Sequence, residues 1–249
     1  MIHLKTAAQI EIMRENGRLL ARIIRECGES IEPGKTTTGD IDRLAAQRIA
    51  EAGATASFFN YRGYPASSCI SVNEVVIHGI PGDRVLNPGD VVDIDVGLCL
   101  NGFHVDSAWT FPVGDISDEA KRLLNVTKES LFQGIAKAKI GNRVGDVSAA
   151  VQKYVDSYRY GIVRELVGHG IGRDLHEEPS VPNFGKAGLG HPLREGTTIC
   201  IEPMINMGTH KVRELADKWT IVTADGKYSA HFEHTIAITK SGPVILTQE

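Results

Sequence analysis

The sequence has no hydrophobic run long enough to span a membrane, which argues against a transmembrane helix. The N-terminal stretch MIHLKTAAQIEIMREN carries charges throughout and contains no apolar core, so it does not have the form of a secretory signal peptide. No CxxC pair is present, which argues against a zinc ribbon and indicates free thiols in a reducing compartment. The four cysteines are Cys27, Cys69, Cys99 and Cys200. We therefore expect a soluble, cytoplasmic protein.

The charge balance has no strong excess of either sign. A net charge of -4 gives no electrostatic reason to expect nucleic acid or an anionic membrane as a partner. Hydrophobic residues make up 42% and charged residues 23%, which is ordinary for a globular protein of 249 residues. No linker, low-complexity run or break in composition is visible. We expect a single domain over residues 1–249.

The order helix, helix, strands is expected twice along the chain. The expected elements are a helix opened by a capping box at Thr6 and Gln9, a second helix ending at Gly53, strands and loops over 57–111, a helix over about 118–139, another helix starting near Gly145, and strands and loops from Val163 onward.

Three sequence matches accompany this repeated order. LNPGDVVDIDV and LREGTTICIEP align without a gap, which places Asp95 on Glu202. PGKTTTGDI resembles IGNRVGDV, and VVIHGI resembles LVGHGI, in the same order along the chain. We interpret these matches as an internal duplication with related halves at roughly 1–117 and 118–249. Equivalent acids from the two halves could then meet on a pseudo-twofold axis.

The segment VVDIDVGLCLNGFHVD predicts a β-hairpin. Asn101-Gly102 is the strongest short signal for a hairpin turn. If these two residues form the turn, Leu100 pairs with Phe103, and the register places Gly97 opposite Asp106.

The same register brings carboxylates together. Alternation puts Asp93 and Asp95 on one face, and Asp95 is then a diagonal neighbour of Asp106. We expect Gly97 to leave an open space between Asp95 and Asp106. Two carboxylates that face one space repel each other unless they share a proton or a cation. These residues alone leave two readings open, a metal site or a polar hairpin face in contact with solvent.

The second half of the sequence adds donors that favour a metal site. Glu202 lies on the strand equivalent to that of Asp95, and Glu233 heads the β-rich run HFEHTIAIT as Asp106 heads SAWTFPV. His169 lies among glycines in GHGIG, where backbone and ligand can approach closely. Taken singly, His169 could be an ordinary loop histidine and Glu202 a turn acid. Together, four carboxylates and one imidazole suit a pair of divalent cations.

In order and flanking sequence, these five residues resemble the metal site of type I methionine aminopeptidases. The matching stretches are NGFHVDS, GHGIGRDLHEEP, IEPM and FEHT, together with SCISVNEVVIHGIPG around His78. The resemblance covers almost the entire chain. It implies the pita-bread fold, an internally duplicated α+β architecture with a curved antiparallel sheet and helices on its outer face.

The resemblance also implies a reaction and a ligand set. A metal-bound hydroxide would attack the first peptide bond and release an N-terminal methionine that precedes a small residue. Asp95 would hold one of two divalent ions (Co, Mn, Fe or Zn), and Asp106 and Glu233 would bridge both. His169 and Glu202 would complete the other site, with Glu202 also handling the proton.

Further residues would contact the substrate by the same resemblance. His78 and His176 would bind the peptide and stabilise the tetrahedral intermediate, and a methionine-sized apolar pocket would be formed by Tyr61, Tyr64, Cys69 and Trp219. The sequence departs from the usual bacterial pattern at four positions, which leaves open the tolerance at the second substrate residue: Phe58, Arg62, Leu175 and His231. By alternation His231 should face the metal side with Glu233 and hold a carboxylate or a bound water there.

The remaining histidines are not expected to bind metal. His104 shares a face with Asp106, but the site is already supplied with ligands. His234 alternates away from Glu233, and the others, His3, His191 and His210, lack any metal-ligand pattern.

The resemblance implies a monomer that acts on the N-termini of nascent polypeptides, with the ribosome as a candidate place of contact. Two alternatives stay open. One is an Xaa-Pro peptidase of the same fold, although such proteins usually carry an additional N-terminal domain. The other is a non-catalytic binding protein on this scaffold, in which the ligands are typically lost.

Overall fold

The computed structural model describes residues 2–249, and in it two helices precede the strands twice along the chain. The first set comprises α1 (Ala7–Glu29), α2 (Thr38–Glu51), β1 (Thr55–Ala56), the short 3-10 helix η1 (Tyr61–Gly63), β2 (Ser68–Val72), β3 (Val75–Ile77), β4 (Val91–Leu100) and β5 (Phe103–Pro112). The second set comprises α3 (Asp118–Ile135), α4 (Val144–Asp156), β6 (Gly161–Ile162), β7 (Gly168–Gly170), β8 (Glu177–Val181), β9 (Thr198–Ile201), β10 (Met204–Asn206), β11 (Val212–Glu214), β12 (Ile221–Thr223), β13 (Ser229–His231), β14 (His234–Thr239) and β15 (Gly242–Ile245).

The helix boundaries follow the capping signals closely. The capping box at Thr6 opens α1, with its hydroxyl accepting from the Gln9 N–H at 3.3 Å. Gly53 adopts a left-handed φ of 70° just beyond α2, as expected for a glycine after a helix. One helix was predicted too long: α3 ends at Ile135 rather than near Lys139. There the backbone tightens, because the N–H of Ala138 donates to the carbonyl of Ile135 instead of continuing the helical pattern.

The strand pairs of the described chain are all antiparallel. The hairpin β4–β5 has the predicted register, with Leu100 paired to Phe103 and Gly97 opposite Asp106. In the second set of elements, β9 begins at Thr198, the residue that the sequence repeat aligns with the first residue of β4. The element order and this shared start agree with the predicted duplication, and the division into two related halves stays a prediction.

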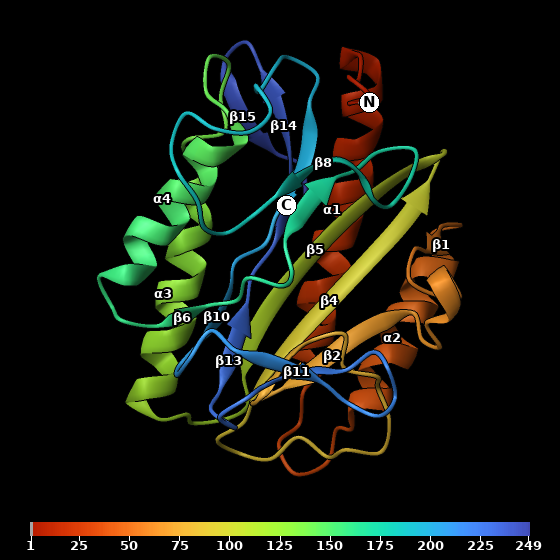
Figure 1. The fold of residues 1–249 in the computed structure, drawn as a ribbon. Coiled ribbons are helices and arrows are strands. Elements are labelled where there is room, and N and C mark those ends of the chain that lie inside the picture. Colours follow the sequence, from red (N-terminus) through yellow and green to blue (C-terminus); the bar gives the residue numbers. More distant parts are fainter. Residues whose placement is uncertain (1) are drawn as a thin grey trace.

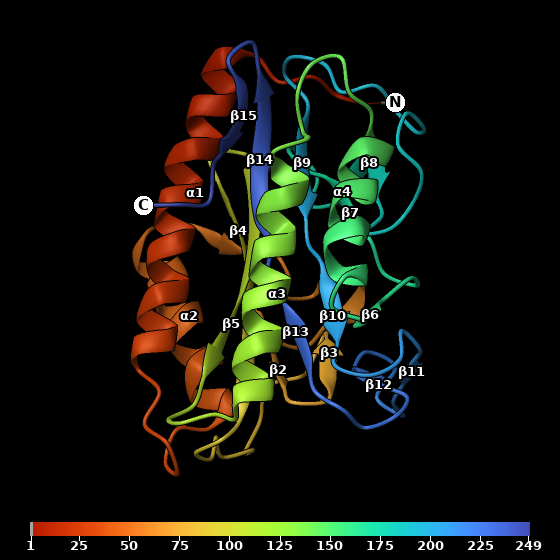
Figure 2. The ribbon, with the colours of Figure 1, turned by 90° about the vertical axis from the view of Figure 1, so that its left-hand side faces the viewer.

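The α-helices lie on one side of the curved antiparallel strands, and the opposite side carries strands and loops but no α-helix (Figures 1 and 2). Helix α1 packs on β4 and β5, and α3 packs on β9, β10 and β13. Apolar side chains at Ile94, Val96 and Leu98 are fully buried in the core beneath α1 and α2. Because side chains alternate along a strand, the aspartates of β4 must point to the face without helices.

No helix within residues 2–249 is both long enough and apolar enough to cross a membrane.

Candidate functional site

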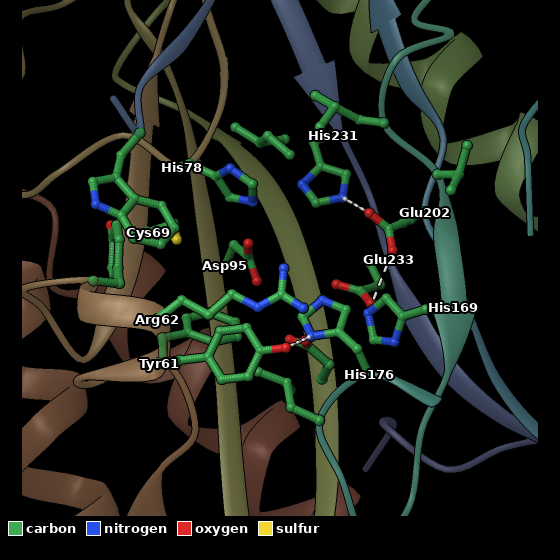
Figure 3. A pocket seen from close by; sticks show the side chains of 18 residues that line it. Tyr61, Arg62, Cys69, His78, Asp95, His169, His176, Glu202, His231 and Glu233 are labelled. Atoms are coloured by element: carbon green, nitrogen blue, oxygen red, sulfur yellow. Dashed lines mark hydrogen bonds and ion pairs between the residues drawn. The ribbon is translucent and has the colours of Figure 1, made fainter. Parts of the chain in front are cut away.

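Three carboxylates meet on the face of the strands opposite the α-helices, and two of them, Asp95 and Glu233, are labelled in Figure 3. Asp95 comes from β4, Asp106 from β5 and Glu233 from the short link between β13 and β14. One carboxylate oxygen of each lies within 4.8 Å of the others. All three side chains are buried, and the most exposed residue, Asp95, retains only 7% of its surface. The hairpin register therefore placed Asp95 beside Asp106 correctly.

Backbone and hydroxyl contacts fix Glu233 against the hairpin. The Glu233 N–H donates to the carbonyl of Ala108 at 2.9 Å, and the Ser107 hydroxyl donates to the carbonyl of Glu233 at 2.7 Å. The Thr235 hydroxyl donates to the carbonyl of Asp106 at 2.7 Å and accepts from the Asp106 N–H at 3.0 Å. These contacts join two segments far apart in the sequence, so that acids on both point to one place.

Glu202 and His169 complete the cluster from the second set of strands. Glu202 directly follows β9, and His169 lies in the middle of β7. His169 Nε2 is 3.7 Å from Glu202 Oε1, and the same imidazole is close to Glu233. His169 Nδ1 lies 2.8 Å from the carbonyl of Gly170, so an N–H there donates to the backbone and leaves the Nε2 lone pair facing the acids. The structure thus brings together all five predicted ligands.

Burial and mutual repulsion raise the pKa values of these acids, so they hold their protons to higher pH than usual. Burial raises the pKa of Asp106 to about 7. Burial also raises the pKa of Glu202, to about 8, with the negative charge of Asp106 acting in the same direction. The pKa values of Asp95 and Glu233 are raised well above normal by burial first and by the charge of Asp106 second. Such a cluster gains by sharing a cation.

The donor set of the cluster fits divalent metal ions. Within residues 2–249, Asp95 Oδ1, Asp106 Oδ1 and Glu233 Oε1 are buried without a hydrogen-bond partner. Burial lowers the pKa of His169 to about 3, so its imidazole is neutral and can offer a lone pair. Carboxylate oxygens together with a neutral imidazole suit hard-to-borderline divalent cations.

A cavity of about 210 Å³ opens directly onto this cluster. Its apolar wall contains three of the predicted pocket residues, Tyr64, Cys69 and Trp219. The Tyr64 ring meets Trp219 edge to face at 5.1 Å between centroids, while its hydroxyl donates to the carbonyl of Gly79 at 3.0 Å. Sequence reasoning missed Ile77, Leu166 and Val167, which also line the cavity; these ordinary apolar residues gave no signal in the sequence.

The two predicted substrate histidines lie at this cavity together with Tyr61 and Arg62 (Figure 3). The Tyr61 hydroxyl is 2.9 Å from His176 Nδ1, and the two rings stack. Arg62 reaches over the cavity toward His176 (Figure 3). Burial and then the charge of Arg62 lower the pKa of His176 to about 4. Burial likewise lowers the pKa of His78 to about 4, so both imidazoles are neutral near pH 7.

One expectation about the hairpin was wrong. We expected Gly97 to leave open space between the acids, but the structure fills the space at Gly97 with Phe58. A Cβ atom on Gly97 would lie 2.8 Å from Cε1 of the Phe58 ring and 3.0 Å from Cβ of Ser57. Gly97 is therefore the residue that lets Phe58 approach β4 and form part of the cavity wall.

His231 faces the cavity as predicted, and its main partner is a residue to which sequence reasoning gave no role. His231 Nδ1 lies 3.3 Å from Oδ2 of the buried Asp93, and its Nε2 is 3.9 Å from Glu202 Oε2. Alternation had placed Asp93 on this face, which was the available signal.

Two other histidines lie apart from the cluster. His104 Nδ1 pairs with the Ser57 hydroxyl at 2.8 Å. His234 contacts Thr247 and the ring of Trp109, so it points away from Glu233 as alternation predicted.

Comparisons with known proteins agree with this geometry. Residues 11–240 match metallopeptidase family M24. The methionine aminopeptidase of Clostridium perfringens (strain 13 / Type A) is 52% identical over 99% of this chain and 99% of that protein. The crystal structure of methionine aminopeptidase from Thermotoga maritima has a TM-score of 0.97 and 43% identity, with 100% of both chains covered. An Xaa-Pro dipeptidase from Bacillus anthracis (TM-score 0.80) is 22% identical, with 99% of this chain and 62% of that chain covered, which shows the fold alone.

Proposed function

The chain belongs to metallopeptidase family M24, and on that premise we propose that it is a methionine aminopeptidase. Its α+β architecture is the pita-bread fold expected from the sequence. The reaction is hydrolysis of the first peptide bond in proteins whose N-terminal methionine precedes a small residue. The observation that carries the proposal is one continuous space, in which an apolar wall at Tyr64, Cys69 and Trp219 leads to the buried acids.

We propose that the acids hold two divalent ions. Asp95 would bind one ion, Asp106 and Glu233 would be shared by both, and His169 and Glu202 would serve the second. Four carboxylates exceed what one ion needs, and two cations would neutralise their mutual repulsion. Co, Mn, Fe and Zn all accept this set of oxygen and nitrogen donors. Bound ions would supply Lewis-acid chemistry, which polarises a carbonyl and makes water nucleophilic at neutral pH.

The chain's own residues would then position the peptide and move its protons. A neutral His176 that accepts the Tyr61 O–H at Nδ1 keeps Nε2–H free to donate to the oxygen of the attacked carbonyl. His78, also neutral, would donate to the same oxygen or to the leaving nitrogen. Glu202 would accept a proton at its carboxylate and return it to the leaving amine.

The cavity wall would set the preference for methionine. Apolar and aromatic side chains line part of this cavity, and an unbranched thioether chain fills such irregular apolar space well. Nascent polypeptides with a free N-terminus would be the substrates. The Xaa-Pro alternative has less support, because the likeness to those enzymes extends to the fold alone.

A turnover assay on Met-Ala-Ser, Met-Leu-Ser and an Xaa-Pro peptide tests this function. The assay is run after chelation and again after adding back Co, Mn, Fe or Zn. We expect metal-dependent release of methionine from Met-Ala-Ser, much slower release from Met-Leu-Ser, and no Xaa-Pro cleavage. Preferential Xaa-Pro cleavage would support the alternative instead, and no cleavage of any peptide with any metal would contradict both.

A further inference from the structure

The segment before α1 is tied to the turn that presents His176. Lys5 forms an ion pair with Glu177, and both side chains are only 4% exposed. The Lys5 ammonium also donates to the carbonyl of His3 at 2.8 Å, and the Lys5 N–H donates to the carbonyl of Gly196 at 2.7 Å. Lys5 is therefore held in place at both its backbone and its side chain.

Glu177 in turn fixes the backbone conformation of the residues just before it. Its Oε2 faces Lys5, while its Oε1 accepts from the backbone N–H of Arg173 at 2.8 Å and of Asp174 at 3.3 Å. The carboxylate thus closes a turn over residues 172–177, and His176 is the residue next to it. The fit is close, since a Cβ on Gly172 would lie 2.2 Å from Lys5 Cε.

No other cation of the turn is in position to replace Lys5. The Arg173 guanidinium lies over the Phe103 ring, 4.6 Å from its centroid, on the hairpin side. A buried carboxylate that loses its cation is unfavourable, and movement of the charged group toward water would break the two backbone bonds to Oε1.

We propose that Lys5 is a positioning residue for His176, which acts by holding Glu177 in the form that closes the turn. The inference rests on the proposed function, because it needs His176 to contact the substrate. The predicted metal ligands have anchors other than Lys5: Asp95 and Asp106 lie on the hairpin, and Gly170, next to His169, pairs with Ile199 of β9 as well as with Glu177. Loss of Lys5 should therefore affect the peptide and leave metal binding intact.

The test compares Lys5→Met with the matched control Lys35→Met, which removes a lysine from an exposed ion pair with Glu32. We measure kcat and KM for Met-Ala-Ser, metal uptake by calorimetry, and amide hydrogen exchange of residues 173 and 174. Lys5→Met should lower kcat/KM by about tenfold or more, bind metal as the parent does, and speed exchange at both amides. Lys35→Met should match the parent in all three.

A pair of double variants separates positioning from a general loss of stability. Lys5→Met with Glu177→Gln removes the buried charge but keeps an acceptor oxygen, so it should recover most of the lost kcat/KM. Lys5→Met with Glu177→Ala has no side-chain acceptor at position 177, so its kcat/KM should remain low. This comparison of the two double variants tests the positioning role of Lys5 even if Lys5→Met alone fails to fold. Equal activity of the two double variants would overturn the proposal.

His176→Ala in the same assay distinguishes failure of the Lys5 proposal from failure of the substrate role proposed for His176. If His176→Ala is strongly impaired while Lys5→Met has parental kinetics and exchange, Lys5 does not position the turn. If His176→Ala is itself fully active, the assigned role of His176 is wrong, and the positioning proposal is overturned with it.

Discussion

Asp93 and His231 form a buried pair across the site, with Asp93 Oδ2 at 3.3 Å from His231 Nδ1, although 138 positions separate them in the sequence. Burial by itself would lower the pKa of His231, but the charge of Asp93 and the hydrogen bond to it outweigh that effect and raise the pKa. His231 Nε2 is buried without a hydrogen-bond partner in the described part of the chain and lies 3.9 Å from Glu202 Oε2. His231 thus connects Asp93 to the predicted metal ligands.

We expect His231→Gln to keep peptidase activity and both metals but to change the acid limb of the pH–rate profile. An imidazole can titrate near neutral pH and a glutamine amide cannot, although nearby bound cations would disfavour the protonated form. The measurement is kcat/KM for Met-Ala-Ser over a pH series, with metal content checked at each end. Superimposable pH–rate profiles for parent and variant would show that His231 contributes only to packing.

Asp106→Ala and Glu233→Ala should each lose at least one metal ion and abolish peptidase activity without unfolding the protein. Each change removes a carboxylate that would hold both proposed ions, while the hydroxyl contacts from Ser107 and Thr235 involve backbone atoms and remain. Metal content by elemental analysis and folding by circular dichroism check this outcome. Near-normal activity with metal occupancy intact would overturn the dinuclear assignment.

His176→Ala should lower kcat by roughly 10²–10⁴-fold, the range for loss of a proton-donating group, while both metals stay bound. The His176 ring contacts Tyr61 and the His169 ring, but its proposed role is with the peptide. Steady-state kinetics and metal titration are measured on the same preparation. A fall in metal content would instead make His176 a ligand.

Metal-free protein should lose stability between about pH 6.5 and 8. Burial raises the pKa of Asp106 from 3.8 to about 7 and of Glu202 from 4.5 to about 8, so the folded state holds protons that the unfolded chain releases. This stabilisation is complete at low pH and is lost as pH rises through both folded values. Buried His169 acts in the opposite direction, but its contribution is complete above its ordinary pKa of 6.5.

Urea unfolding with a chelator at pH 6.5 and pH 8 measures this loss. Metal-loaded protein, whose carboxylates are already ionised, serves as the control and should show a smaller change. A metal-free protein that is equally stable at both values, or more stable at pH 8, would contradict the raised pKa values.

Gly97→Ala should raise KM for Met-Ala-Ser and destabilise the protein by about 1–3 kcal/mol, the usual cost of overpacking. The added methyl group would push against the Phe58 ring at 2.8 Å and move it within the cavity wall. Combining Gly97→Ala with Phe58→Leu should recover much of both losses, because the clash is with the ring. Additive effects of the two changes would show that they act independently.

Sequence reasoning was most accurate where the information was local. The turn at Asn101-Gly102 and strict alternation fixed the register of β4 and β5, and with it the meeting of Asp95 and Asp106. The approach of Glu233 followed only from the repeat and the resemblance, since no local rule brings together residues so far apart.

What the sequence did not predict depends on contacts between distant segments. Phe58 occupies the space at Gly97, Asp93 holds His231, and Lys5 is buried against Glu177. Each partner has an unremarkable sequence context, and a lysine five residues from the start of a chain is normally expected in solvent. Their roles emerge only from tertiary packing.

The hydroxyl contacts that join Ser107 to Glu233 and Thr235 to Asp106 also set when the centre can assemble. The hairpin that carries Asp95 and Asp106 can form early, because its contacts are local, whereas Glu233 arrives only after more than a hundred further residues have been synthesised. A chain still emerging from the ribosome therefore has an incomplete ligand set. If the proposed ligands hold the metal, tight metal capture would be a late event in folding, and unfinished chains would neither trap ions nor cleave peptides.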